Sequence, residues 1–160
     1  MSLCLRAIHG AELPDCFICL DVRGFYENFT TLEAAADWNQ CGQHVANRQR
    51  LAEHPYWPSF VEELRAKLLE AKGRTTLRKN KIGVILYCRS GRDRSVGCAL
   101  LTHAILKNIQ GWSGTFEHLC QKTWRRSGVA CVRRRCLPCF ADSDRTSEQC
   151  LPAGFRWDPL

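Results

Sequence analysis

The hydrophobic pattern of the chain contains two short, continuous apolar runs, 16–20 and 82–86. Runs of this length that are rich in Ile, Val, Leu and Phe are typical of strands in a parallel sheet. Asp21 directly follows the first run and Tyr87 follows the second, so each run ends at a side chain with a polar group. We therefore predict two strands that end at Asp21 and Tyr87.

Helical periodicity is clearest between residues 58 and 69. Apolar side chains recur there at every fourth position, at Phe60, Leu64 and Leu68. This spacing predicts an amphipathic helix with one buried stripe. On its polar side, Glu63 and Lys67 have the i, i+4 spacing of a favourable ion pair. Gly73 is expected to close the helix.

Two further segments are predicted to be helical. The apolar stretch 96–106 is long enough for a buried helix. The capping-box sequence 30–33 predicts a helix that continues towards Leu51, although Gly42 weakens its middle. The alternation of strands and helices predicts a single α/β domain with a mostly parallel sheet and helices on its faces.

The chain has 160 residues, which is enough for one hydrophobic core. We expect the α/β domain to cover residues 1–125 and a basic, cysteine-containing extension to cover 126–160. No segment approaches the roughly 18 continuous apolar residues of a membrane span. Residues 1–10 also lack the apolar core of a secretory signal. A cytoplasmic location is therefore expected.

The most informative segment, 87–96, reads YCRSGRDRSV and joins the second strand to the helix 96–106. Backbone N–H groups in such a turn, and at the start of the following helix, have no intrahelical partners and can bind an anion. Arginine side chains add donors that suit phosphate oxygens. The predicted phosphate-binding residues are Arg89, Ser90, Gly91, Arg92, Arg94 and Ser95. Asp93 would repel a phosphate, so we expect it to point away and to hold an arginine in place.

Asp21 and Arg23 follow the first predicted strand. Ligands of open α/β sheets bind at the carboxyl ends of the strands, so both side chains are expected to face the same crevice as the loop. The alternative is that Asp21 only caps the turn that follows it.

The loop resembles the sequence Gly-Cys-Thr-Gly-Gly-x-His-Arg-Ser-Val of the C-terminal domain of the RapZ family of bacterial RNase adapter proteins. The matching positions are Cys88, Gly91, Arg94, Ser95 and Val96. The chain departs from the pattern at Arg89, Ser90 and Asp93. The segments 20–25, 58–74 and 116–119 are similar in order to further parts of that domain, the last as a strand carrying His118. No Gly-x4-Gly-Lys-Ser/Thr sequence occurs, so the similarity is limited to the C-terminal domain.

The resemblance implies a binding module for a sugar phosphate, for structured RNA, or for both. It also implies a ligand pocket that includes Asp21, Arg23 and His118. No cofactor is required for such a role, and the sequence does not identify the ligand or the oligomeric state.

A second interpretation is a cysteine-dependent phosphatase, because Cys88, five intervening residues and Arg94 have the spacing of that catalytic loop. Cys88 would then be the nucleophile and Arg94 the phosphoryl binder. These enzymes carry a Trp-Pro-Asp acid, whereas Trp57-Pro58 is followed here by Ser59. Tyr87 also replaces the usual histidine before the nucleophile. We therefore expect a binding module in which Cys88 is structural, with the phosphatase as the alternative.

The chain has 11 cysteines, an odd number that fits a reducing compartment. Cys19 and Cys98 fall in predicted elements and are expected to be small buried side chains. A possible structural zinc site is formed by Cys131, Cys136 and Cys139, with Cys120, His118 or Cys150 as the fourth ligand. The alternative is that these residues are free thiols in a basic tail.

Charge is unevenly distributed along the chain, which has a net charge of +7. Residues 1–71 carry 6 basic and 10 acidic side chains, whereas 72–160 carry 17 basic and 6 acidic ones. Such a basic half attracts polyanions, although a solvated positive surface is the alternative. The predicted nucleic-acid-binding residues are Arg78, Lys79, Lys81, Arg125, Arg126, Arg133, Arg134 and Arg135.

Overall fold

A computed structural model of the chain describes residues 14–26, 42–74, 81–89, 91, 93–109, 114–116 and 118. Its elements are β1 (Cys16–Asp21), η2 (Val22–Gly24), α2 (Val45–Glu53), α3 (Trp57–Arg74), β2 (Ile82–Tyr87) and α4 (Arg94–Lys107). Among the helices of these ranges, none is both long and apolar enough to cross a membrane.

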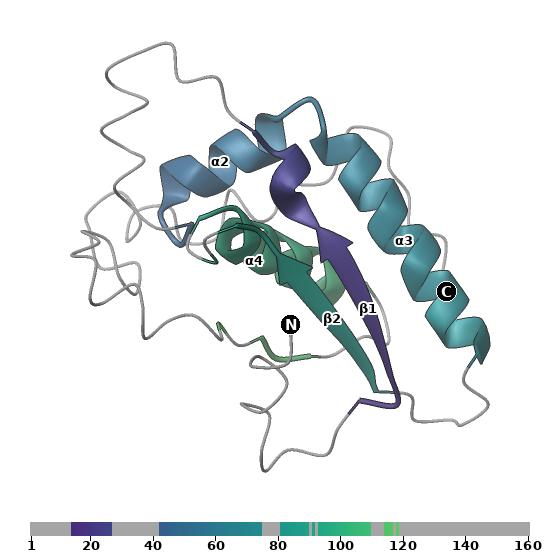
Figure 1. Cartoon of the computed structure of the whole chain (residues 1–160). Helices are drawn as coiled ribbons and strands as arrows, with labels where there is room; N and C mark the ends of the chain where they lie inside the picture. The colour runs from purple at the N-terminus through teal and green to yellow at the C-terminus, as the bar shows by residue number, and fades with distance from the viewer. Residues whose placement is uncertain are drawn as a thin grey trace.

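The two strands form a parallel pair, in which Cys16 lies beside Ile82 and Asp21 beside Tyr87. This arrangement confirms the prediction of an α/β fold with a parallel sheet. Because the strands run in the same direction, η2 and the loop after β2 both leave the sheet at one edge, at the arrowheads in Figure 1. The register therefore brings two predicted parts of the site together.

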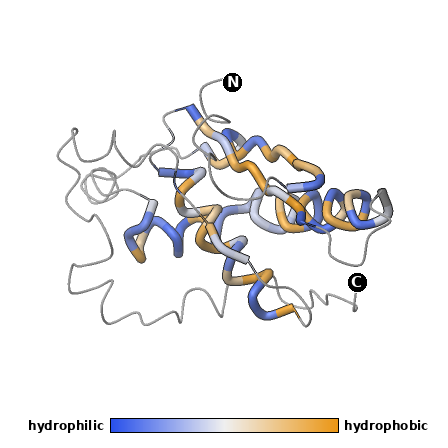
Figure 2. The backbone as a smooth tube through the Cα atoms, turned by 90° about the horizontal axis from the view of Figure 1, so that it is seen from below, coloured by the Kyte–Doolittle hydropathy of each residue, from blue (hydrophilic) through white to orange (hydrophobic). Residues whose placement is uncertain are grey.

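The hydrophobic core lies on one face of this pair. Side chains of a strand alternate between its faces, and Ile18 and Leu20 of β1 are buried in a single cluster with residues of all three α-helices. Figure 1 shows α4 behind the strands and α3 alongside β1. Hydrophobic residues run along both strands in Figure 2. Within the described part of the chain, helices thus cover one face of the sheet and not two.

The α3 helix matches its predicted periodicity but is longer than predicted. Phe60, Leu64 and Leu68 are completely buried. The predicted pair is present, with 3.5 Å between Lys67 Nζ and Glu63 Oε1. The helix continues through Gly73 to Arg74, because a glycine in an exposed last turn weakens a helix without ending it.

The prediction of one helix from residue 30 towards Leu51 is wrong for residues 42–44. The α2 helix begins at Val45, and His44 is its N-cap, with Nδ1 accepting the Ala46 N–H at 3.2 Å. A Cβ atom at Gly42 would lie 1.9 Å from the backbone oxygen of Asp93. The chain therefore crosses the start of α4 in backbone contact, and Gly42 permits a close approach that helix propensity does not reveal. Residues 27–41 lie outside the described ranges.

The predictions for two other segments also need correction. Cys98 is buried as expected, but Cys19 is exposed because it points to the face of β1 opposite the core. The strand predicted around residues 116–119 is not formed at residues 116 and 118. Phe116 lies instead against His103 of α4, with 4.9 Å between the ring centroids.

We predict that Gly42→Ala lowers the free energy of unfolding by about 1–3 kcal/mol, because the added methyl group must displace the first turn of α4. Gly73→Ala is the control, since a Cβ atom there would meet no other atom within 4 Å. That change should stabilise the chain by roughly 0.5–1 kcal/mol through its helix propensity. Thermal unfolding followed by circular dichroism measures both. Equal midpoints for the two variants would contradict the described backbone contact.

Candidate anion-binding site

The predicted phosphate loop joins the end of β2 to the start of α4. The helix begins at Arg94, two residues before its apolar stretch, so Arg94 and Ser95 belong to its first turn. Gly91 has a φ of 64°, a left-handed conformation that glycine adopts without the steric penalty of other residues. The left-handed residue lets the chain turn tightly between the end of β2 and the start of α4. Ser90 and Arg92 lie outside the described residues.

The Cys88 sulfur joins three parts of this loop. Its Sγ accepts a hydrogen bond from the Gly91 N–H at 3.2 Å, and its S–H donates one to the Ser95 hydroxyl oxygen, also at 3.2 Å between Sγ and Oγ. These bonds connect the strand end, the turn and the helix. They are consistent with the structural role expected for Cys88. The Gly91 N–H and the Ser95 hydroxyl would also stabilise a thiolate at this position.

Arg94 connects the loop to the segment after β1. Its Nη1 donates to the backbone oxygen of Arg23 at 3.1 Å and to that of Phe25 at 3.5 Å. A guanidinium group has further N–H donors on Nε and Nη2, so this contact orients the side chain without using all of its hydrogen-bonding capacity. Arg94 is therefore held at the carboxyl edge of the sheet by backbone groups from the neighbouring strand's end.

Asp21 and Arg23 form a bidentate ion pair at the same edge. Arg23 Nε lies 2.9 Å from Asp21 Oδ1 and 2.8 Å from Oδ2. Asp21 Oδ1 also accepts the Arg23 N–H at 2.9 Å, so Asp21 does cap the turn. The hydrogen bond from Arg23 lowers the pKa of the Asp21 carboxyl group, and the positive charge of Arg94 lowers it further. Asp21 thus both caps the turn and lies beside the loop.

A group of buried polar side chains lies around the start of α2, and the sequence interpretation missed it. Its members are Gln43, His44, Asn47 and Arg48. Arg48 is only 1% exposed and Asp93, at the start of α4, only 5%. Gly42 was the available sign that this segment contacts α4, but a glycine within a helical pattern equally predicts a weak point in a helix.

Two other predicted site residues lie elsewhere in the fold. His118 lies beside Phe116, with ring centroids 5.2 Å apart, and burial lowers its pKa. Phe116 in turn packs against His103 of α4. The described ring contacts of His118 are therefore with this part of the fold and not with Asp21. Lys81 precedes β2 and is therefore at the amino end of the sheet, opposite the loop.

The remaining predicted residues lie outside the described ranges. They are Arg78, Lys79, Arg125, Arg126, Arg133, Arg134 and Arg135 of the basic surface, and Cys120, Cys131, Cys136 and Cys139 of the zinc hypothesis. The described residues themselves contain no group of three or more potential metal ligands. The zinc and basic-surface hypotheses thus stay predictions from the sequence.

Comparisons of the chain with protein-family models, with curated proteins and with solved structures find no match. The similarity to the RapZ C-terminal domain consequently rests on the sequence of the loop and of the short segments around it.

Proposed function

We propose that the chain is a binding module that recognises a phosphorylated ligand through the loop 88–95. The observation that carries this proposal is the hydrogen bond from Arg94 Nη1 to the Arg23 backbone oxygen, 3.1 Å long. It joins the loop to the Asp21–Arg23 turn at the carboxyl edge of a parallel sheet, where α/β proteins bind ligands.

The electrostatics of this edge favour an anion. The N-terminus of α4 carries a partial positive charge and outward-pointing N–H groups. Arg89 is exposed beside it, and Arg94 belongs to the first helical turn. In this proposal the carboxylate of Asp93, which is 5% exposed, points away from the ligand. A phosphoryl group would thus meet N–H donors and arginines.

The resemblance to the RapZ family narrows the ligand to a sugar phosphate, to RNA, or to both. The net charge of residues 72–160 supports a polyanionic partner, because basic segments attract nucleic acid in a salt-dependent way. In this proposal the loop binds one phosphate and the basic segments bind neighbouring ones. Structural zinc in the segment 120–139 belongs to the same proposal and awaits a metal analysis of the purified chain.

A second candidate function is the cysteine-dependent phosphatase. It is favoured by the hydrogen bonds of Cys88 Sγ with Gly91 N and Ser95 Oγ, which suit a thiolate nucleophile. The acid of the Trp-Pro-Asp pattern is replaced, however, since Ser59 follows Trp57-Pro58, and these residues form the first turn of α3. Loss of a general acid costs about 10²–10⁴-fold in rate. Binding without turnover is therefore the better-supported function.

Arg94→Ala should weaken the binding of inorganic phosphate and glucose 6-phosphate by about 1.5–3 kcal/mol, the range for a hydrogen bond to a charged group. Isothermal titration calorimetry measures this loss. Lys107→Ala is the matched control, because it removes an exposed cation from the other end of the same helix. Arg89→Ala tests the site without disturbing the backbone contacts of Arg94. Unchanged affinity in both arginine variants would show that the loop is only a structural turn.

Cys88→Ser distinguishes the two functions. With p-nitrophenyl phosphate as substrate, we expect hydrolysis near background in the unaltered chain and in the variant alike. Phosphate binding should persist in the variant, because serine preserves a polar group at the strand end. Turnover that disappears in Cys88→Ser, or a phosphocysteine trapped at this position, would establish the phosphatase instead.

Alkylation by iodoacetamide provides a third test, read by peptide mass spectrometry. Burial raises the pKa of the Cys98 thiol well above its usual range, so Cys98 should remain unmodified until the chain unfolds. The half-exposed Cys88 should react in the folded chain, and saturating phosphate should slow its reaction. Exposed Cys19 is the internal control, since its rate should not change with phosphate. Equal slowing at both cysteines would contradict a ligand at the loop.

A further inference from the structure

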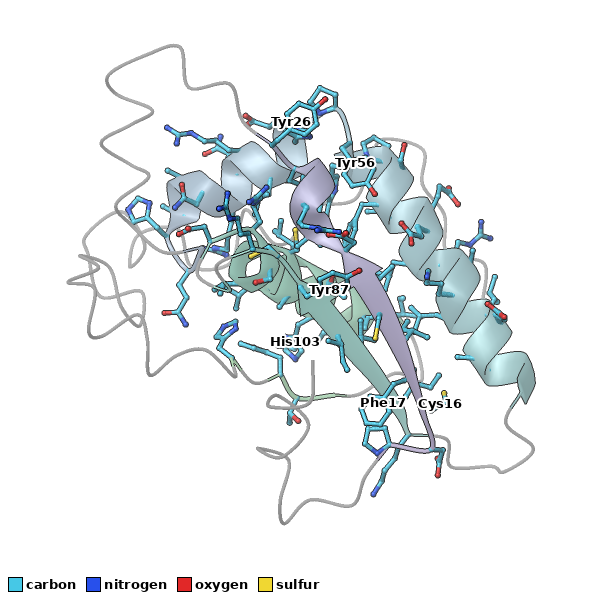
Figure 3. All side chains as sticks on the ribbon, in the orientation of Figure 1. Cys16, Phe17, Tyr26, Tyr56, Tyr87 and His103 are labelled. Carbon is cyan, nitrogen blue, oxygen red and sulfur yellow. The ribbon has the colours of Figure 1, made fainter. Side chains whose placement is uncertain are left out.

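The face of the sheet opposite the core carries a second group of side chains. Strand alternation and the parallel register place Phe17 and Cys19 of β1 on this face together with Ile85 and Tyr87 of β2. Phe17 is 38% exposed, and Cys19 is exposed as well. Figure 3 shows Phe17 and Tyr87 in front of the strands, on the side away from α4. No helix of the described ranges covers this face, since all three pack on the core.

Gly83 allows the Phe17 ring to approach the neighbouring strand closely. A Cβ atom at Gly83 would be 2.5 Å from Phe17 Cδ1 and 2.7 Å from Cε1. Glycine weakens a strand interior, and it is typically found there where another group approaches closely. The ring therefore occupies the place of the missing side chain, and Phe17 remains partly exposed over β2.

Tyr87 provides a second ring at the carboxyl end of the same face. It lies four residues after Gly83, which corresponds to about 13 Å along the strand. Bases stacked in a duplex strand are about 3.4 Å apart, so two bases on these two rings cannot stack on each other. The spacing consequently fits an extended strand with unpaired bases and does not fit a double helix.

Positive side chains lie at both ends of this face. Lys81 directly precedes β2, and the exposed Arg89 follows it. Two carboxylates lie near these cations: Asp15 Oδ2 accepts the Lys81 N–H at 2.8 Å, and Asp21 pairs with Arg23. Aromatic rings between cations are the arrangement with which proteins bind single-stranded nucleic acid. The rings flanked by Lys81 and Arg89 thus favour a single-stranded polyanion over a protein partner.

We propose that this outward face binds single-stranded RNA, with Phe17 and Tyr87 stacking on two unpaired bases and with Lys81 and Arg89 contacting phosphates. The inference rests on the nucleic-acid branch of the proposed function and specifies its ligand as unpaired RNA. It adds a base-stacking surface to the phosphate loop, which begins directly after Tyr87. The two sites can be tested separately, because the rings of Phe17 and Tyr87 belong only to the stacking surface and Arg94 belongs only to the loop, although Arg89 contributes to both.

The experiment measures the fluorescence anisotropy of a labelled decauridylate titrated with the full chain. Phe17→Leu and Tyr87→Leu remove a ring but keep an apolar side chain, and each should weaken binding about tenfold or more. Tyr87→Phe retains the ring and should bind as the unaltered chain does. Gly83→Ala should act like Phe17→Leu, because the methyl group displaces the ring. Phe116→Leu is the matched control, since Phe116 is 44% exposed but lies against His103.

Two further ligands distinguish the stacking surface from the loop: a ten-base-pair RNA duplex is used as a competitor, and inorganic phosphate is titrated as a ligand of the loop. We expect the duplex to compete poorly with decauridylate, and both leucine variants to keep their affinity for phosphate. Loss of phosphate affinity in Arg94→Ala, with the leucine variants unchanged, would support the loop and overturn the stacking surface. Equal competition by the duplex, or no binding of decauridylate, would also overturn it. Leucine variants that alter sedimentation but not affinity would identify the face as a protein interface and overturn the proposal.

Discussion

The parallel pairing of β1 with β2 is the constraint on which the rest of the site depends. Because Asp21 lies beside Tyr87 in the register, the turn after the first strand and the loop after the second leave the sheet together. An antiparallel pair would place them at opposite ends. Arg94 can reach the Arg23 backbone oxygen only because of this arrangement. The proposed anion site is therefore a consequence of strand direction as much as of the loop sequence.

Several polar groups at this edge form hydrogen bonds or ion pairs within the protein. Cys88 Sγ connects the turn to the helix, Arg94 is bonded to the backbone after β1, and Asp21 holds Arg23. Such bonds fix side-chain orientations in advance, which lowers the entropic cost of binding. Gly42, just before α2, contacts the backbone at the start of α4, where the loop ends. Neighbouring segments thus hold both ends of the loop.

Two glycines permit close contacts, one beside the loop and one on the outward face of the sheet. Gly42 permits the chain to touch the start of α4, next to the anion site. Gly83 permits the Phe17 ring to lie on β2, on the opposite face. In both cases the missing Cβ atom makes room for a group that is distant in sequence. The anion loop and the aromatic face then meet at Tyr87, which allows one extended ligand to contact both.

The local elements were determined by the sequence itself. Both strands, the α3 stripe and the helix after the loop follow from hydrophobic runs and spacing, because neighbouring residues decide those patterns. The tertiary structure decided what depends on distant contacts. It delayed the start of α2 to Val45, turned Cys19 outward, and gave Arg94 its backbone partners. Such features depend on which segments meet in space, and the periodicity of a single segment contains no information about its neighbours.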